Sequence, residues 1–322
     1  MRGIVALAVA AGILAGPAAA QRREAPDSTA IRRLADALAA DSMRGRGPWS
    51  PEATEAARFL ADQLRRLGAR PLVGPSLLVP FTVPERPADT VFNVVAFLPP
   101  RRGSTDTTLV GLTAHLDHLG VDSADATGDS IYNGFLDDAI GDAMVLDVAR
   151  RYAAHPGDRG LAVFFFNLEE QGLLGSLALI RDTASHPALR RLVLMIGVDA
   201  GAPAGEALDW ELIGALPAHP AALLADSLAR LHGWTTRATP PRPISDAYLF
   251  ARVGIPILFP IPGASWRGYS SAGRDSAMAR FDHYHQPADQ PQAAFPMVGT
   301  AWFAEWLWEV VQGYAGPPSP RS

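Results

Sequence analysis

From about residue 90 onward, short and almost wholly apolar runs alternate with stretches of helical character. Five runs have the length and composition of strands buried on both faces: Val91–Leu98, Thr108–Ala114, Leu161–Asn167, Leu192–Val198 and Ile255–Phe259. Helices are predicted at Ala139–Ala154, Ala221–Leu231 and Ala293–Tyr314. This alternation predicts an α/β fold, a three-layer sandwich in which helices flank a central mixed, mostly parallel sheet.

Two helices are predicted ahead of this region. The first covers Ile31 to Ala40. The second begins at Pro51, with Ser50 as its cap and Gly68 where it would stop. Its apolar residues recur at helical spacing, so we expect one face to pack against the rest of the chain.

The chain divides into four expected parts: a signal peptide at 1–20, an N-terminal helical segment at 21–88, the α/β domain at 89–316 and a flexible tail at 317–322. The first part has a positive start, an apolar run from Ile4 to Leu14 and small residues at 18–20, as secretory signals do. The run is too short to span a bilayer. We expect a secreted or periplasmic protein without membrane association after cleavage, and a retained anchor is the alternative.

Composition narrows the chemistry. All 28 positively charged side chains are arginines, and cysteine is absent, which excludes lysine and thiol nucleophiles, disulfides and cysteine-ligated zinc. The net charge of −5 without a basic stripe argues against a nucleic-acid partner. Any metal must therefore bind to histidine, aspartate and glutamate side chains.

Ionisable side chains follow three of the predicted strands: His115, Asp117 and His118 after the second, Glu169 and Glu170 after the third, and Asp199 after the fourth. Taken singly, each has an ordinary explanation, such as a surface histidine, helix-opening glutamates or a capping aspartate. Together we expect them to lie at the sheet edge where α/β proteins bind ligands. Several carboxylates gathered there would repel one another unless a cation held them. The set also matches the ligands of catalytic zinc.

Four stretches carry a specific resemblance: AHLDHLG at Ala114–Gly120, YNGFLDD at Tyr132–Asp138, NLEEQGLLGS at Asn167–Ser176 and YHQPAD at Tyr284–Asp289. In this order and spacing they resemble peptidase family M28, which contains bacterial di-zinc aminopeptidases and the glutamate carboxypeptidase II group. The resemblance runs from about residue 30 to 315 and includes the Gly45–Arg46 turn. It implies the fold of zinc-dependent exopeptidases.

The resemblance also implies two Zn²⁺ ions per chain. One ion would be bound by His115 and Asp199, the other by Glu170 and His285, and both by Asp137. An aspartate can join two metals because its carboxylate has two oxygens.

Three further residues receive roles from the resemblance. Glu169 matches the general base, which takes a proton from the zinc-activated water and returns it to the departing amine. Tyr284 matches a tyrosine whose hydroxyl stabilises the oxyanion. Asp117 is expected to accept a hydrogen bond from the other ring N–H of His115. The peptide bond between Asp137 and Asp138 is expected to be cis.

Two stretches depart from the family pattern. Ala247 stands where members often carry a histidine that is not a metal ligand, which affects the substrate pocket and leaves the metal centre intact. Residues 264–280 are longer and more polar than usual. We expect a surface loop there, with a mobile flap as the alternative. His118 and His283 flank expected ligands, and we expect each of them either to contact a metal ligand without binding metal or to face solvent.

The predicted function is metal-dependent hydrolysis of peptides, by an aminopeptidase that releases N-terminal residues. Four carboxylates beside two dications suit a substrate ammonium group, although Arg242 or Arg267 could bind a terminal carboxylate instead. A glutaminyl-cyclase-like acyltransferase with one zinc and a non-catalytic binding domain are the alternatives. The complete set of ligands for two ions argues against both.

Overall fold

The computed structural model describes residues 24–181, 186–199, 201–216 and 218–316. The expected signal peptide and C-terminal tail lie outside these residues. None of the helices in the described part of the chain is both long and apolar enough to cross a bilayer.

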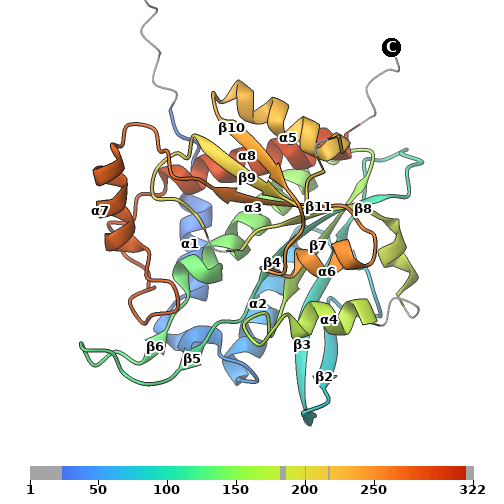
Figure 1. Cartoon of the computed structure of the whole chain (residues 1–322). Helices are drawn as coiled ribbons and strands as arrows, with labels where there is room; N and C mark the ends of the chain where they lie inside the picture. The colour runs from blue at the N-terminus through green and yellow to red at the C-terminus, as the bar shows by residue number, and fades with distance from the viewer. Residues whose placement is uncertain (1–23, 182–185, 200, 217, 317–322) are drawn as a thin grey trace, which may run out of the picture.

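A nine-stranded sheet forms the centre of the molecule (Figure 1). Its order is β1-β3-β7-β4-β8-β11-β9-β10, and β2 also pairs with β3. The strands are β1 Arg70–Pro71, β2 Leu78–Val83, β3 Arg86–Leu98, β4 Leu109–His115, β7 Gly160–Phe166, β8 Leu192–Gly197, β9 Asp209–Ile213, β10 Thr235–Thr239 and β11 Ile257–Pro262. A separate hairpin joins β5 Gly120–Val121 to β6 Ile131–Tyr132.

Parallel pairing covers the four central strands, since β4 is parallel to β7 and β8, and β8 to β11. Antiparallel pairs flank this centre at β3–β7 and β9–β11. Every residue of β4 and β7 is buried, which explains why their sequences are continuous apolar runs. The expected mixed sheet is confirmed, with its parallel part in the middle.

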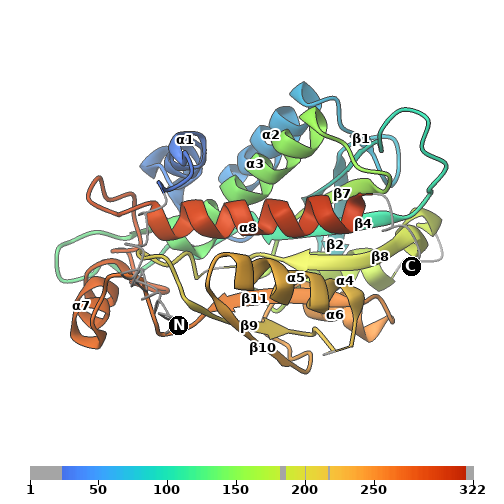
Figure 2. The ribbon, with the colours of Figure 1, turned by 90° about the horizontal axis from the view of Figure 1, so that it is seen from above.

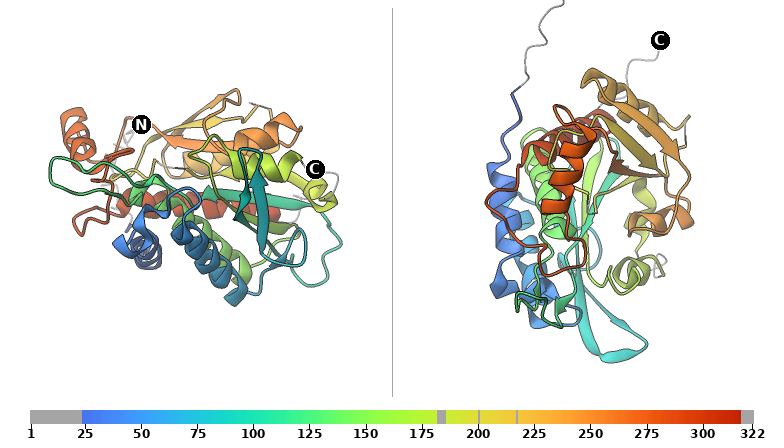
Figure 3. Two further views of the ribbon diagram at one scale, coloured as in Figure 1. Left: turned by 90° about the horizontal axis from the view of Figure 1, so that it is seen from below. Right: turned by 60° about the vertical axis from the view of Figure 1, so that its left-hand side comes forward.

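Helices cover both faces of the sheet, as Figures 2 and 3 show. One face carries α1 Thr29–Leu38, α2 Pro51–Arg66, α3 Ile140–Ala154, α5 Pro220–Leu231 and α8 Val298–Ala315. The other carries α4 Leu174–Arg181 and α6 Ala247–Arg252. The short helical turns are η1 Asp41–Arg46, η2 Phe135–Ala139 and η3 Pro187–Arg191. The expected three-layer α/β sandwich is confirmed.

The N-terminal segment shares the main hydrophobic core of the sheet domain. Ile31 of α1 and Leu60 of α2 belong to the same buried cluster as Val110 of β4 and Trp306 of α8. The predicted cap of α2 forms, because Ser50 Oγ accepts a hydrogen bond from the Ala53 backbone N–H at 3.0 Å. This segment is not purely helical, since β1 and β2 also lie before residue 89.

The expectation of a surface loop at residues 264–280 is wrong. Helix α7, Ser271–Phe281, occupies most of this stretch, and its N-cap is Ser270, whose hydroxyl accepts a hydrogen bond from the Gly273 N–H at 3.1 Å. Met278 and Phe281 are its only large apolar residues and only Phe281 is buried, so the helical period is weak in the sequence. In Figure 3 (right), α7 lies toward the viewer, beside the edge where the central strands end.

Candidate metal centre

The carboxyl ends of the central strands bring the predicted residues together. His115 is the last residue of β4, Glu169 and Glu170 follow β7, and Asp199 follows β8. His285 reaches the same edge from the segment after α7. All five predicted metal-binding residues therefore lie in one place, although they are spread over 171 positions of sequence.

Asp137 enters the site through an irregular turn. Gly134 has a left-handed backbone with φ of 60°, and η2 follows it. The peptide bond between Asp137 and Asp138 is cis, as expected. The carboxylate of Asp289 holds the turn by accepting the backbone N–H of Leu136 at 2.9 Å and that of Asp137 at 3.2 Å.

The two oxygens of Asp137 face two different histidines. Its Oδ1 lies 3.1 Å from His115 Nε2, and its Oδ2 lies 3.2 Å from His285 Nε2. His115 Nε2 is also 3.4 Å from Asp199 Oδ1, and His285 Nε2 is 3.0 Å from Glu170 Oε2. Asp137 therefore stands between two clusters, one on each side of its carboxylate.

The donor atoms of these clusters fit metal ions. Oδ2 of Asp137 and Nε2 of His115 and His285 are buried, yet none of them makes a hydrogen bond of good geometry within the described residues. Two groups of side chains have potential ligand atoms within 4.8 Å of one another: His118, Asp137, Glu170 and His285, and His115, Glu169 and Asp199. Imidazole and carboxylate ligands without sulfur are typical of catalytic zinc.

The electrostatics of the site point the same way. Burial alone would lower the pKa of His115, but Asp199 and Asp137 raise it well above its usual value. Burial and the neighbouring carboxylates of Asp199 and Asp246 raise the pKa of Glu169 to about 10. So many acidic groups in one buried place repel one another, and bound cations would favour their ionised forms.

Glu169 and Glu170 lie on a tight turn directly after β7. Leu168, which precedes them, has φ of 58°, and the Leu173 N–H donates to the Glu169 carbonyl. The carboxylate of Asp117 accepts both glutamate N–H groups, at 3.0 Å from Glu169 and 3.4 Å from Glu170. The turn thus directs two consecutive side chains into different clusters.

Asp117 makes a different contact from the expected one. His115 Nδ1 lies 3.1 Å from the backbone carbonyl of Asp117, whereas the nearest carboxylate oxygen is 3.9 Å away. The backbone carbonyl is therefore the closer acceptor for this ring nitrogen. The carboxylate instead fixes the turn that carries the two glutamates.

Tyr284 lies at the mouth of the site. Its ring stacks on that of His285, with centroids 3.8 Å apart, and 59% of the residue is exposed. Partial burial and the nearby carboxylates of Asp137 and Glu170 raise the pKa of its hydroxyl to about 12. At neutral pH the phenol keeps its proton and can donate a hydrogen bond.

The sequence predicted the surroundings of Arg46 and His118 only in part. Arg46, read there as part of a turn, is fully buried, and its guanidinium donates to the carbonyls of Leu38, Leu116, Asn133 and Gly134. It thereby ties the segments before Asp117 and Asp137 together. His118 lies inside the site, with Nδ1 at 2.8 Å from Glu170 Oε1. His283 lies apart, near the carbonyl of Arg280.

Ala247 has a packing role. It is buried in the core cluster on the α4 and α6 face. The Cβ of Ala247 packs closely on Gly197 of β8, since a Cβ added to Gly197 would lie only 2.9 Å from it. A small residue therefore allows α6 to approach the sheet closely. The adjacent Asp246 is buried and accepts a short hydrogen bond from the Ser176 hydroxyl.

Known structures share this fold. A zinc aminopeptidase from Bacillus subtilis superposes with a TM-score of 0.68 at 14% identity, covering 93% of this chain and 98% of that one. An aminopeptidase from Aneurinibacillus sp. strain AM-1 gives 0.65 at 14%, covering 92% and 97%. A glutaminyl cyclase from Porphyromonas gingivalis gives 0.64 at 19%, covering 90% and 99%. No curated protein sequence matches the chain.

A comparison of the sequence with protein-family models identifies the family. The model of peptidase family M28 matches residues 93–306, which include β4, η2, β7, β8 and the segment that carries Tyr284 and His285. The match spans all the residues of the two clusters described above. The chain belongs to peptidase family M28, a family of metallopeptidases, and its activity class is the metal-dependent hydrolysis of peptide bonds.

Proposed function

We propose that this protein is an aminopeptidase that uses two zinc ions. One ion would be held by His115 and Asp199, the other by Glu170 and His285, with Asp137 shared between them. The observation that carries the proposal is the position of the Asp137 carboxylate, whose two oxygens face His115 and His285 at 3.1 and 3.2 Å. A carboxylate placed between two sets of ligands is the arrangement of two-metal hydrolytic sites.

Glu169 is the proposed general base. When bound, the two ions would supply Lewis acidity and lower the pKa of a shared water. Glu169 takes the proton of the attacking water and returns it to the departing amine. The cations beside it would lower its pKa from the value of about 10 that burial and the neighbouring carboxylates impose. Tyr284 donates a hydrogen bond to the developing oxyanion.

Charge favours a free amino terminus as the recognised end of the substrate. Arg242 and Arg267, the arginines that the sequence analysis considered for a terminal carboxylate, are engaged elsewhere, and Arg274 near the site is paired with Asp275. Arg242 binds both carboxylate oxygens of Glu211, at 2.8 and 2.9 Å, and Arg267 binds Glu206 at 2.8 Å. The carboxylates of the metal centre are left to attract a substrate ammonium group.

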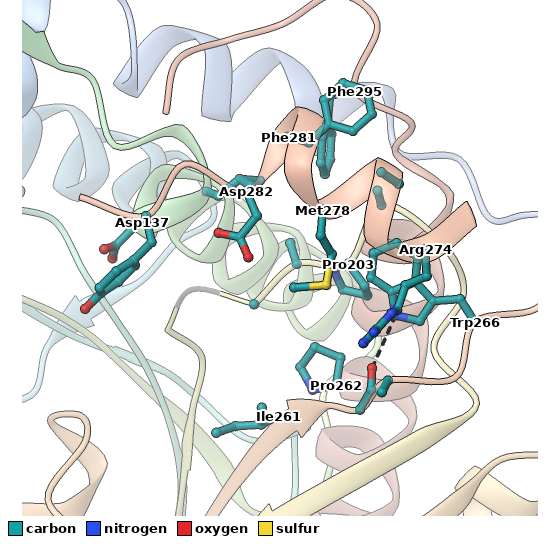
Figure 4. Close-up of a pocket in the computed structure, with 18 of the residues that line it drawn as sticks. Asp137, Pro203, Ile261, Pro262, Trp266, Arg274, Met278, Phe281, Asp282 and Phe295 are labelled. Carbon is teal, nitrogen blue, oxygen red and sulfur yellow. Dashed lines mark hydrogen bonds between the residues drawn. The ribbon is translucent and has the colours of Figure 1, made fainter. Parts of the chain in front are cut away.

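An apolar cavity beside the site suits the first side chain of such a substrate. It has a volume of about 360 Å³, and its lining includes Asp137, Tyr284 and the α7 residues Met278 and Phe281. Figure 4 shows Asp137 at one side of this cavity and Met278 and Phe281 further along it. Its lining is mainly apolar and includes Pro203, Ile261, Pro262, Trp266, Met278, Phe281 and Phe295, together with the charged residues Arg274, Asp282 and Asp289. We infer a preference for large aliphatic or aromatic residues at the amino terminus of the peptide.

The test compares a leucine anilide with its N-acetyl form at equal concentration, using protein whose zinc content has been measured. Acetylation removes the positive charge and adds bulk, so we expect cleavage of the free anilide only. Equal rates would overturn the aminopeptidase assignment. One zinc per chain together with cyclisation of N-terminal glutamine would favour a glutaminyl cyclase. A chain that binds no zinc would favour a non-catalytic binding domain.

We also propose export of the protein, directed by residues 1–20. Their positive start, apolar run and small residues support it. Expression of the full gene in a bacterial host with separation of periplasm and cytoplasm tests it. The mature protein should begin at Gln21 and be found outside the cytoplasm.

A further inference from the structure

His118 is a buried side chain of the site to which the proposed function gives no role. It follows the expected ligand His115 by three positions and is fully buried. Its ring lies edge-on against that of His285, with centroids 5.6 Å apart. It therefore stands within the cluster that holds Glu170, Asp137 and His285.

The two oxygens of the Glu170 carboxylate contact two different histidines. Oε2 lies 3.0 Å from His285 Nε2, on the side of the proposed metal site. Oε1 lies 2.8 Å from His118 Nδ1, which is an ordinary hydrogen-bond length. His118 Nδ1 is 3.9 Å from Asp137 Oδ2, too far for a second hydrogen bond. His118 thus contacts the oxygen of Glu170 that faces away from His285.

These distances favour a hydrogen bond over metal coordination by His118. Ligand atoms at ~2.0–2.1 Å from a tetrahedral zinc lie roughly 3.3 Å from one another. The contacts of His285 Nε2 with Asp137 and Glu170, at 3.2 and 3.0 Å, are close to this value. The His118 contact is shorter, and it is made with the other oxygen of Glu170.

The surroundings also indicate which ring nitrogen of His118 carries the proton. A neutral imidazole carries one N–H, and Nδ1 faces a carboxylate while Nε2 is buried with no acceptor in the described part of the chain. The proton is most stable on Nδ1, because an N–H without an acceptor would cost free energy.

The position of the ring is fixed by close packing. The backbone N–H of His118 donates to the carbonyl of Arg46 at 3.2 Å. Gly134, in its left-handed conformation, leaves room for the ring, since a Cβ there would lie 2.6 Å from His118 Cγ. The guanidinium of Arg46 in turn donates a hydrogen bond to the carbonyl of Gly134 at 2.9 Å. The ring has little freedom to turn away from Glu170.

We propose that His118 is a positioning residue, which donates a hydrogen bond from Nδ1 to Glu170 Oε1 and keeps Oε2 directed at the metal shared with His285. This inference rests on the proposed two-zinc site. Outer hydrogen-bond partners of metal ligands contribute ~10–100-fold to metal affinity. We expect His118 to raise the affinity for one of the two ions by this factor and to have little effect on the ion at His115 and Asp199.

The test measures the two zinc dissociation constants of the mature protein by competition with a chromophoric chelator. His118→Leu keeps much of the volume and removes the donor, and we expect one ion to bind ~10–100-fold more weakly. His118→Asn keeps an N–H donor near the position of Nδ1 and should restore much of that affinity. His283→Asn is the matched control at the partly exposed histidine that lies two positions before His285, and it should bind both ions as the wild type does.

A second measurement does not depend on the folding of any variant. In the zinc-loaded wild-type protein labelled with ¹⁵N-histidine, His118 should show a protonated Nδ1 and an unprotonated Nε2 that is not bound to metal. A metal-bound nitrogen of His118, or unchanged affinity for both ions in His118→Leu, would overturn its positioning role alone. Failure of the wild-type chain to bind two zinc ions would overturn the proposed function as well.

Discussion

Glu169 and Glu170 are neighbours in sequence but belong to different clusters of the site. Glu170 Oε2 lies 3.0 Å from His285 Nε2, whereas Glu169 groups with His115 and Asp199. The turn after Leu168 and the carboxylate of Asp117 produce this separation. The two glutamates should therefore respond differently to substitution.

Replacing Glu169 by glutamine keeps the size of the side chain and removes the base. We expect kcat on a leucine anilide to fall by at least ~100-fold while both zinc ions stay bound. Glu170→Ala removes a proposed ligand, so it should release one zinc ion as well as activity. Elemental analysis alongside the kinetics distinguishes the two effects. Near-normal turnover of Glu169→Gln would contradict the assigned base.

At the residue scale, the sequence predicted the side chains of the site better than their contacts. Four of the five proposed ligands lie in the quoted motifs, Asp199 follows a predicted strand, and all five do come together. The acceptor nearest to His115 Nδ1, a backbone carbonyl in place of the Asp117 carboxylate, depends on local backbone geometry that residue types do not encode. The burial of Arg46 could not be foreseen either, because its partners are carbonyls of distant segments.

At the scale of elements, the fully buried strands at the centre of the sheet were predicted, whereas β2, β9 and β10 were not. Strands β4 and β7 are buried on both faces, so their composition alone identifies them. Strand β10, Thr235–Thr239, lies at the sheet edge and is mostly polar, and β2 contains a proline. Their structure is imposed by pairing with β9 and β3, which no local pattern reveals.

Helix α7 is the element that we expect to set substrate preference. Met278 and Phe281 line the apolar cavity, whereas Ser276 of the same helix is exposed and does not. Met278→Glu would place a negative charge in the cavity and should lower kcat/KM for leucine and phenylalanine anilides by at least ~10-fold. An arginine anilide should be affected less, because its charge is complementary.

The control for this prediction is Ser276→Glu, which adds the same charge to the same helix outside the cavity. We expect its kcat/KM values to stay within about twofold of the wild type, as for most surface substitutions. Equal effects of the two variants on all three anilides would mean that charge on α7, and not the cavity, alters activity.

At the scale of the whole molecule, the fold gathers acidic groups that are costly to bury together. Burial raises the pKa of Asp117 to about 7 and that of Asp246 to about 8. Without metal, the folded protein then binds more protons than the unfolded chain between roughly pH 4 and 8, because unfolded aspartate has a pKa of about 3.9. The free energy of unfolding should therefore fall as the pH rises through this window.

Bound zinc should reverse this trend, since cations favour ionised carboxylates and compete with protons for histidine. At a free zinc concentration about 100 times each dissociation constant, two ions would add roughly 5 kcal/mol to the stability of the folded state. That corresponds to a rise in Tm on the order of 10 °C for a domain of this size.

Chelation should lower Tm by this amount, and the loss should be larger at pH 8 than at pH 6. Calorimetry with and without chelator at both pH values measures it, and the variant Asp137→Ala, which lacks the shared ligand, should respond weakly. A Tm that is the same before and after verified removal of zinc would show that the acidic cluster is stable without cations.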